Sequence, residues 1–349
     1  MKKTIFYTVA IFIMLAMGEI FFGVAFYLKD VKYELRHAPE TVDFPYLYYS
    51  FKSNNDFVND DGLYTKKSLR KKKEKYRIIL VGGSTARSST APYDKTIVAY
   101  LERELNSRFK TNVIEVINAG MSGYVVEQEF IFIQMLLYKY EPDMIVGLDG
   151  YNDLMSFKLN RHFNSQILYP PQNWRDFLVI SQGKEKIKFH YRLKALFKNI
   201  FRAADFINRI IHKQNQYDYS NINEEILDKY KEGYWRIVND IYDFCSAKKI
   251  KYYNFLQPVK YYLPNNKTNY VREGGIETLG KLYRKYDIET IKIPYAFSLT
   301  DILESHLDVY TDAVHVSTDG NIVFAKAMAN YLEKKLISEI QLKEEDIDK

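Results

Sequence analysis

Short apolar runs alternate with longer amphipathic stretches from Tyr76 onward, and this alternation restricts the possible folds more than any other feature of the sequence. Strands are predicted for the apolar runs at 77–82, 113–120, 143–150, 251–258 and 288–294. Helices are predicted for the stretches at 95–109, 128–140, 223–248, 272–286 and 318–337. Repeated strand-then-helix units favour a parallel sheet covered by helices on both faces. In such folds, functional side chains gather at the carboxyl ends of the strands.

Composition excludes several classes of protein. With 47% hydrophobic and 27% charged residues in 349, the chain is neither wholly disordered nor a protein of many membrane spans. Its single cysteine, Cys245, excludes an intramolecular disulfide and a cysteine-cluster metal site. The helical pattern around Cys245 predicts a buried small residue rather than a nucleophile. Six histidines leave little material for a histidine-based metal site, and we expect neither metal nor cofactor.

The net charge of +6 comes from one short stretch of the chain. Residues 66–77 hold eight Lys or Arg and one Glu, so the rest of the sequence sums to −1. The basic residues therefore form a local cluster and not a binding face, and we expect no nucleic-acid partner. A solvated linker is the expected role of this cluster, and contact with anionic lipid is the alternative.

Residues 4–28 form an apolar run whose only charged residue is Glu19. Its 25 residues exceed the ~20 that a helix needs to span a bilayer, so we expect a single-pass N-terminal membrane anchor. The alternative is a cleaved signal peptide, but the run continues well past the small residues that could precede cleavage. Lys and Arg flank both ends, so their number does not fix the orientation of the anchor.

We expect three regions along the chain: the anchor at 1–30, a linker with the basic cluster at 31–76, and one domain at 77–340. An insertion at about 155–222 interrupts the predicted alternation. Its segment 188–213 carries apolar residues on one helical face and Lys or Arg on the other. This pattern predicts a cap helix packed on the domain, with a lid or a helix on a membrane surface as alternatives.

Small and polar residues follow the first three predicted strands. Ser84 follows Gly82 and Gly83, Gly123 follows the second strand, and Asn152 stands in Gly150-Tyr151-Asn152-Asp153 after the third. Each of these turns has an ordinary interpretation, as a helix cap or a loop. Because all three follow predicted parallel strands, we expect them to meet at one edge of the sheet.

A fourth motif, Asp312-Ala313-Val314-His315, directly precedes the last predicted helix. At this spacing an aspartate can orient a histidine ring through one nitrogen while the other nitrogen faces a serine. Taken alone, such a pair is more often an ordinary surface pair than a catalytic one. His306, with Asp308 nearby, is a weaker candidate because it lies in an irregular stretch.

Taken together and in this order, the four motifs resemble the SGNH (GDSL-like) hydrolase superfamily. The resemblance rests on Ser84 in GGST, Gly123 in NAGMSGY, Asn152 in GYND, and Asp312 and His315 in DAVH. Residues 56–62 also resemble the lead-in of membrane-anchored bacterial members. The first motif departs from the GDSL form at Gly83, where that form has aspartate. The resemblance implies a flavodoxin-like three-layer α/β/α sandwich with a parallel sheet, an N-terminal transmembrane helix and a helical insertion.

The resemblance also implies a serine esterase or acyl-transfer mechanism. Ser84 would be the nucleophile, His315 the general base and Asp312 its partner, with the N–H groups of Ser84 and Gly123 and the Asn152 amide forming the oxyanion hole. The expected activity is removal of acyl groups, chiefly O-acetyl, from a carbohydrate or surface polysaccharide by a domain outside the cytoplasm. Alternatives are a polysaccharide O-acetyltransferase, a lipase-like or lysophospholipase-like esterase, and a non-catalytic binding protein.

Overall fold

The computed structural model describes residue 7 and residues 41–44, 47–51, 58–65, 67, 75–88, 91–159, 223–260, 262 and 276–347. The predicted anchor at 4–28, except Tyr7, the helix at 188–213 and most of the insertion at 155–222 lie outside the described residues. No helix within the described ranges is long and apolar enough to cross a membrane. The chain divides into two units, and the larger one, Phe44–Pro171 with Tyr219–Lys349, contains the sheet and the candidate site.

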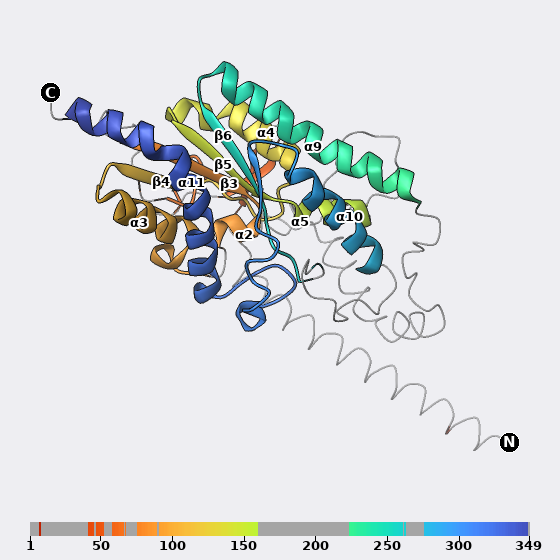
Figure 1. Ribbon diagram of the computed structural model, residues 1–349. Helices are drawn as coiled ribbons and strands as arrows, with labels where there is room; N and C mark the ends of the chain where they lie inside the picture. Colours follow the sequence, from red (N-terminus) through yellow and green to blue (C-terminus); the bar gives the residue numbers. More distant parts are fainter. Residues whose placement is uncertain are drawn as a thin grey trace. The chain divides into compact units, whose positions relative to one another are not determined.

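A five-stranded parallel sheet forms the centre of the larger unit (Figure 1). Its strands lie in the order β4-β3-β5-β6-β7, which is the 2-1-3-4-5 order of flavodoxin-like folds. Their bounds are β3 Tyr76–Gly82, β4 Ile114–Asn118, β5 Met144–Asp149, β6 Lys251–Leu256 and β7 Ala296–Ser298. Two short strands precede the sheet in the chain, β1 Thr41–Phe44 and β2 Tyr48–Phe51. The predicted parallel α/β architecture is confirmed.

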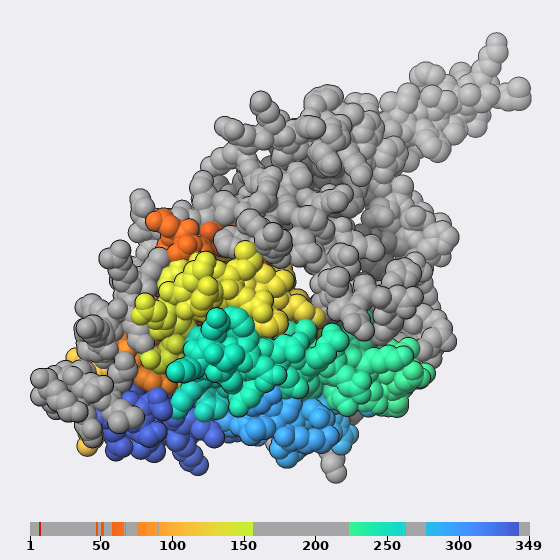
Figure 2. Space-filling model, turned by 90° about the horizontal axis from the view of Figure 1, so that it is seen from above, coloured from red at the N-terminus to blue at the C-terminus, as the bar shows by residue number. Residues whose placement is uncertain are grey.

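Helices cover both faces of this sheet (Figure 1). One face is covered by α3 Ile97–Phe109 and α11 Thr318–Ile347, and the other by α4 Val126–Met135, α9 Glu224–Ala247 and α10 Ile276–Thr290. Figure 2 shows α9 lying between α4 and α10 on the second face. The shorter helices are α2 Ser84–Arg87, α5 Tyr151–Leu159, η1 Tyr93–Lys95, η2 Leu137–Tyr140 and η3 Leu307–Val309.

The alternation of side chains along β3 builds a separate core on each face of the sheet. Ile79 and Val81 belong to the core beneath α4, α9 and α10, whereas Ile78 and Leu80 belong to the core beneath α3 and α11. All four side chains are fully buried. A strand buried on both faces needs apolar residues at consecutive positions, which is the pattern that predicts it in the sequence.

Four described apolar residues within the predicted linker at 31–76 belong to the core. Leu47, Phe51, Val58 and Leu63 are at most 5% exposed and belong to the core of the α4 face. The Phe51 ring also lies 3.3 Å from the Arg87 guanidinium, measured to the ring centroid. Apart from Phe51, which ends β2, these residues lie outside the helices and strands and pack against distant parts of the chain, so no periodicity in the sequence predicts their burial.

The last predicted strand, at 288–294, is wrong. Helix α10 continues to Thr290, and the edge strand is β7 three residues after Ile293. The segment contains three isoleucines, but Ile288 is 47% exposed and Ile291 is 86% exposed, so they do not form one buried face. The last helix extends beyond its predicted end and beyond the predicted domain boundary at 340, to Ile347.

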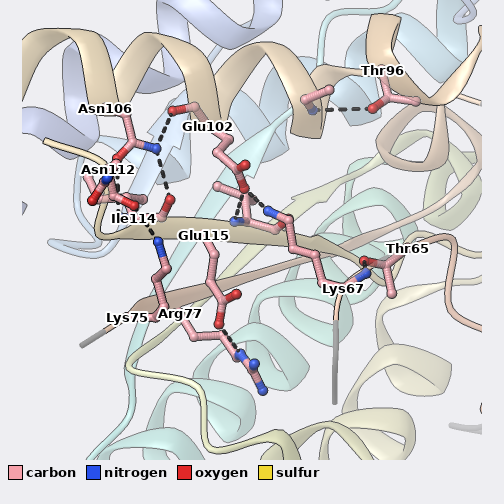
Figure 3. A network of polar contacts seen from close by, with 12 residues as sticks. Thr65, Lys67, Lys75, Arg77, Thr96, Glu102, Asn106, Asn112, Ile114 and Glu115 are labelled. Atoms are coloured by element: carbon pink, nitrogen blue, oxygen red, sulfur yellow. Dashed lines mark hydrogen bonds and ion pairs between the residues drawn. The ribbon is translucent and has the colours of Figure 1, made fainter. Parts of the chain in front are cut away.

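Side chains of α3 cover the outer edge of β4 (Figure 3). Glu102 accepts the Val116 N–H at 2.7 Å, and Lys67, which forms an ion pair with Glu102, donates to the Val116 carbonyl at 3.1 Å. The Asn106 amide both accepts the Ile114 N–H and donates to the Ile114 carbonyl. These side chains satisfy the backbone groups that an edge strand would otherwise expose to another strand.

Candidate active site

Ser84 lies at the carboxyl edge of the sheet, directly after β3. The strand ends at Gly82, Gly83 is the residue before the helix, and Ser84 is the first residue of α2. Its side chain is half-buried. The backbone N–H of a first helical residue has no acceptor within its own helix and so remains available to a ligand.

His315 lies in a tight loop just before α11. Tyr310 and Val316 form an antiparallel bridge at the base of the loop, and the Thr311 N–H donates to the His315 carbonyl at 2.9 Å. Inside the loop, one carboxylate oxygen of Asp312 accepts the backbone N–H groups of Val314 at 2.9 Å and His315 at 2.8 Å. The loop therefore fixes both the aspartate and the backbone of the histidine.

The structure brings Ser84, His315 and Asp312 into one chain of hydrogen bonds. Ser84 Oγ lies 2.6 Å from His315 Nε2, and His315 Nδ1 lies 2.6 Å from Asp312 Oδ2. The Asp312 side chain is 54% exposed and that of His315 is 28% exposed. Partial burial acts to raise the pKa of Asp312, but the Val314 and His315 N–H groups and the histidine ring outweigh it and hold that pKa below its ordinary value.

The Asn152 amide lies beside the serine turn. Asn152 is in the first turn of α5, which follows β5, and its Nδ2 donates to the Tyr124 carbonyl at 2.7 Å. A Cβ atom added to Gly83 would lie 2.3 Å from the same Nδ2 atom, so a side chain at position 83 would displace the amide from its present place. This contact gives a physical reason for glycine at the position where the GDSL form has aspartate.

Gly123 completes the predicted set of site residues. It is exposed and has a φ of +82°, a backbone conformation that favours glycine. Its neighbour Tyr124 is the residue whose carbonyl accepts the Asn152 amide. Ser84, Gly123 and Asn152 thus come from the segments after β3, β4 and β5, and the Asn152 amide bonds the turn after β5 to the turn after β4.

The remaining two candidates lie away from this site. His306 is exposed, and it precedes η3 without capping it by its side chain. Cys245 is buried in α9, as predicted, and burial raises the pKa of its thiol to about 12. Among the described residues, no three or more His, Cys, Asp or Glu side chains are grouped so that they could hold a metal ion.

A group of buried acids behind the site was missed by the sequence analysis. Glu129, Asp149 and Asp153 are at most 4% exposed and lie on the side of the sheet that α4 and α9 cover. Burial is the largest cause that raises their pKa values, to about 8 for Asp149 and about 6 for Asp153. The alternation of side chains along a strand could have revealed Asp149, because it points to the same buried face as Ile145 and Gly147.

Glu129 and Asp149 form a carboxyl–carboxylate pair. No N–H group of the described residues reaches the Glu129 carboxyl, whose partner is the carboxyl of Asp149. Burial, and then the charge of Asp149, raise the pKa of Glu129 well above its ordinary value. Asp149 also accepts a hydrogen bond from Asn254 at 2.9 Å, which favours its charged form.

No protein-family model matches the sequence, and no curated protein matches it. Solved structures of similar arrangement include an acetyl xylan esterase, AlAXEase, with 13% identity and a TM-score of 0.40, covering 73% of this chain and 99% of the other. A GDSL-like lipase from Bacteroides thetaiotaomicron has 14% identity, a TM-score of 0.37 and coverages of 77% and 93%. The esterase EstA from Pseudoalteromonas sp. has 12% identity, a TM-score of 0.41 and coverages of 75% and 99%.

Similarity at this level assigns neither a family nor an activity to this chain. The fold is instead established by the parallel strand order, and any activity has to be argued from the arrangement of side chains at the carboxyl edge.

Proposed function

We propose that this protein is a serine esterase of the SGNH type that removes acyl groups, chiefly O-acetyl, from a carbohydrate. The observation that carries the proposal is the chain of two 2.6 Å contacts from Ser84 Oγ through the His315 ring to Asp312. This arrangement activates a serine hydroxyl in enzymes of several unrelated folds. The Asn152 amide, which donates one of its two hydrogens to the Tyr124 carbonyl, lies beside Gly83 in the turn that carries Ser84.

In the proposed reaction, Ser84 Oγ attacks the ester carbonyl carbon while His315 Nε2 accepts the hydroxyl proton. Asp312 accepts the Nδ1 hydrogen bond, which fixes the tautomer of His315 and stabilises the imidazolium that forms. The oxyanion is held by the Ser84 and Gly123 N–H groups and the Asn152 amide. Collapse breaks the bond to the leaving alcohol, which takes the proton from His315, and water then releases the acyl group by the same steps.

The carbohydrate substrate rests on the sequence. The resemblance to the SGNH superfamily suggests an ester, and the apolar segment at 4–28 suggests an envelope location, where acylated polysaccharides are exposed to enzymes. We further propose that this segment anchors the chain in a membrane, with the domain outside the cytoplasm. The full-length protein should then fractionate with membranes. A soluble mature chain that begins near Glu19 would contradict the anchor.

A fluorophosphonate probe tests the nucleophile. It should label the wild-type protein at Ser84, and Ser84→Ala should lose both labelling and turnover, whereas His306→Ala should keep both. Turnover that persists in the Ser84→Ala variant would sink the proposal.

A substrate panel tests the acyl group and its acceptor. Acetylated sugars and p-nitrophenyl esters of increasing chain length should show the fastest turnover with acetyl. A preference for long acyl chains would favour a lipase instead. The same panel with an added sugar acceptor separates hydrolysis from transfer, because only a transferase would move the acetyl group to that acceptor.

A further inference from the structure

Two hydrogen bonds join the start of α4 to the start of α5. The Asn152 side chain donates to the Tyr124 carbonyl at 2.7 Å, and the Val126 N–H donates to Asp153 Oδ1 at 3.1 Å. The two bonds run in opposite directions between the same two segments, so together they resist both sliding and rotation of one helix start against the other. The first segment also carries Gly123, and the second carries Asn152 itself.

Asp153 occupies a place where a carboxylate is costly. Its side chain is 3% exposed. Its charge helps to raise the pKa values of three neighbouring acids, Glu127, Glu129 and Asp149. Burial raises the pKa of Asp153 to about 6, while the N–H groups of Val126, Asp153 and Gly150 lower it. The Asp153 side chain thus accepts the Val126 N–H at the start of α4, while the backbone of its own turn favours its charged form.

We propose that Asp153 is a positioning residue for the oxyanion hole, because its carboxylate holds the turns that carry Gly123 and Asn152 in register. The inference rests on the proposed esterase function. Asp153 touches no reacting atom in this account. It acts through Asn152, whose amide must meet the oxyanion at hydrogen-bond distance, and displacement of a catalytic group by about 1 Å can lower turnover by about 10²-fold.

The position of Val126 allows the same bond to be removed from its other end. Val126 is the first residue of α4, a position that tolerates proline because no intrahelical bond is lost there. The preceding Val125 has φ −107° and ψ 163°, which is the backbone region that a residue before proline prefers. Val126→Pro therefore removes the donor to Asp153 while it keeps the start of the helix.

The test measures kcat and KM of the full chain with p-nitrophenyl acetate. Asp153→Ala and Val126→Pro should each lower kcat by about 10- to 100-fold and leave KM nearly unchanged. Asp153→Asn should recover most of the loss, because its side-chain oxygen can still accept the Val126 N–H. In the Asn152→Ala background, Asp153→Ala should cost clearly less than in the wild type, since one of the two donors that it positions is already gone.

Asp143→Ala is the matched control. Asp143 accepts the Arg77 N–H at 2.7 Å near the opposite end of β5, so its loss removes the same type of bond away from the site. This variant should have a lower Tm but an unchanged kcat.

Wild-type kcat in Val126→Pro would overturn the inference, and so would full additivity of Asp153→Ala with Asn152→Ala. If Asp153→Ala fails to fold, Val126→Pro and its combination with Asn152→Ala decide the question. Ser84→Ala separates the two proposals. If that variant remains active, the esterase function itself fails, whereas if it is inactive and Val126→Pro is fully active, only the positioning role fails.

Discussion

Asp312 and Asp153 are the same side chain in two opposite settings. Asp312 is 54% exposed, accepts two backbone N–H groups and the histidine ring, and has a lowered pKa. Asp153 is 3% exposed, also accepts backbone N–H groups, and has a pKa raised to about 6. Hydrogen bonds favour the charged form in both places, so the difference in sign comes from burial. The exposed carboxylate of Asp312 can stay charged and support the histidine during proton transfer. The buried carboxyl of Asp153 lies away from the reacting atoms and fixes the backbone around it.

Loss of the nucleophile should produce the largest effect at the exposed edge. Ser84→Ala should lower kcat by about 10⁶-fold, and adding His315→Ala should make it hardly worse, because residues that act as a unit are not additive. Steady-state kinetics on an acetyl ester measure both variants. A double variant that is far slower than Ser84→Ala would mean that His315 acts separately from the serine.

Asp312→Asn tests the exposed member of the comparison. The amide keeps the shape of the carboxylate but cannot hold the histidine in the required tautomer, so we expect kcat to fall by up to about 10⁴-fold. Asp308→Asn, an exposed aspartate near His306, is the control and should have unchanged activity. Equal activities of the two variants would show that Asp312 has no part in the reaction.

Asn152→Ala should have a smaller effect than either change in the triad. Removal of one oxyanion donor lowers kcat by about 10²–10³-fold, and KM should stay nearly constant because the contact forms only in the transition state. A rise in KM with constant kcat would instead identify Asn152 as a group that binds the substrate. The same kinetic assay distinguishes the two outcomes.

Glu129→Gln tests the buried acids that surround Asp153 and should change stability rather than turnover. A folded-state pKa above the unfolded value of about 4 means that the stabilising contribution of Glu129 is complete below that pH. It is lost as pH rises towards the raised pKa of Glu129, because the unfolded chain then releases a proton that the folded protein still holds. The glutamine amide does not titrate and can donate to Asp149. The variant should therefore be more stable than wild type at pH 8, by about 1–3 kcal/mol, and the difference should shrink towards pH 5.

Chemical unfolding at the two pH values measures this difference. Glu232→Gln, at an exposed position on α9, is the control and should leave the pH dependence unchanged. If Glu129→Gln is less stable than wild type at pH 8, the Glu129 carboxyl stabilises the fold at that pH. Burial would then not disfavour its charged form, and the contrast between exposed and buried carboxyl groups would fail.

The sequence predicts those parts of the structure that depend on neighbouring residues in the chain. Consecutive apolar residues in β3 indicate a strand buried on both faces, and the Asp-x-x-His spacing is short enough for one loop to fix both side chains. The order of the polar turns along the chain also predicts that Ser84 and Asn152 share one edge, because parallel strands all end on the same side. These inferences need only local geometry and the rules of parallel sheets.

Only the tertiary structure decides the contacts between segments that are far apart in the sequence. Leu47 and Leu63 lack periodicity and pack by shape against distant helices, so their burial cannot be read from their neighbours. The apolar residues at 288–294 predict a strand, yet Ile288 and Ile291 are exposed and the helix continues to Thr290. Likewise, Glu129 on α4 and Asp149 on β5 meet only when that helix docks on the sheet. The reason is physical: the burial that changes the pKa of a carboxyl group is created by residues that the local sequence does not contain.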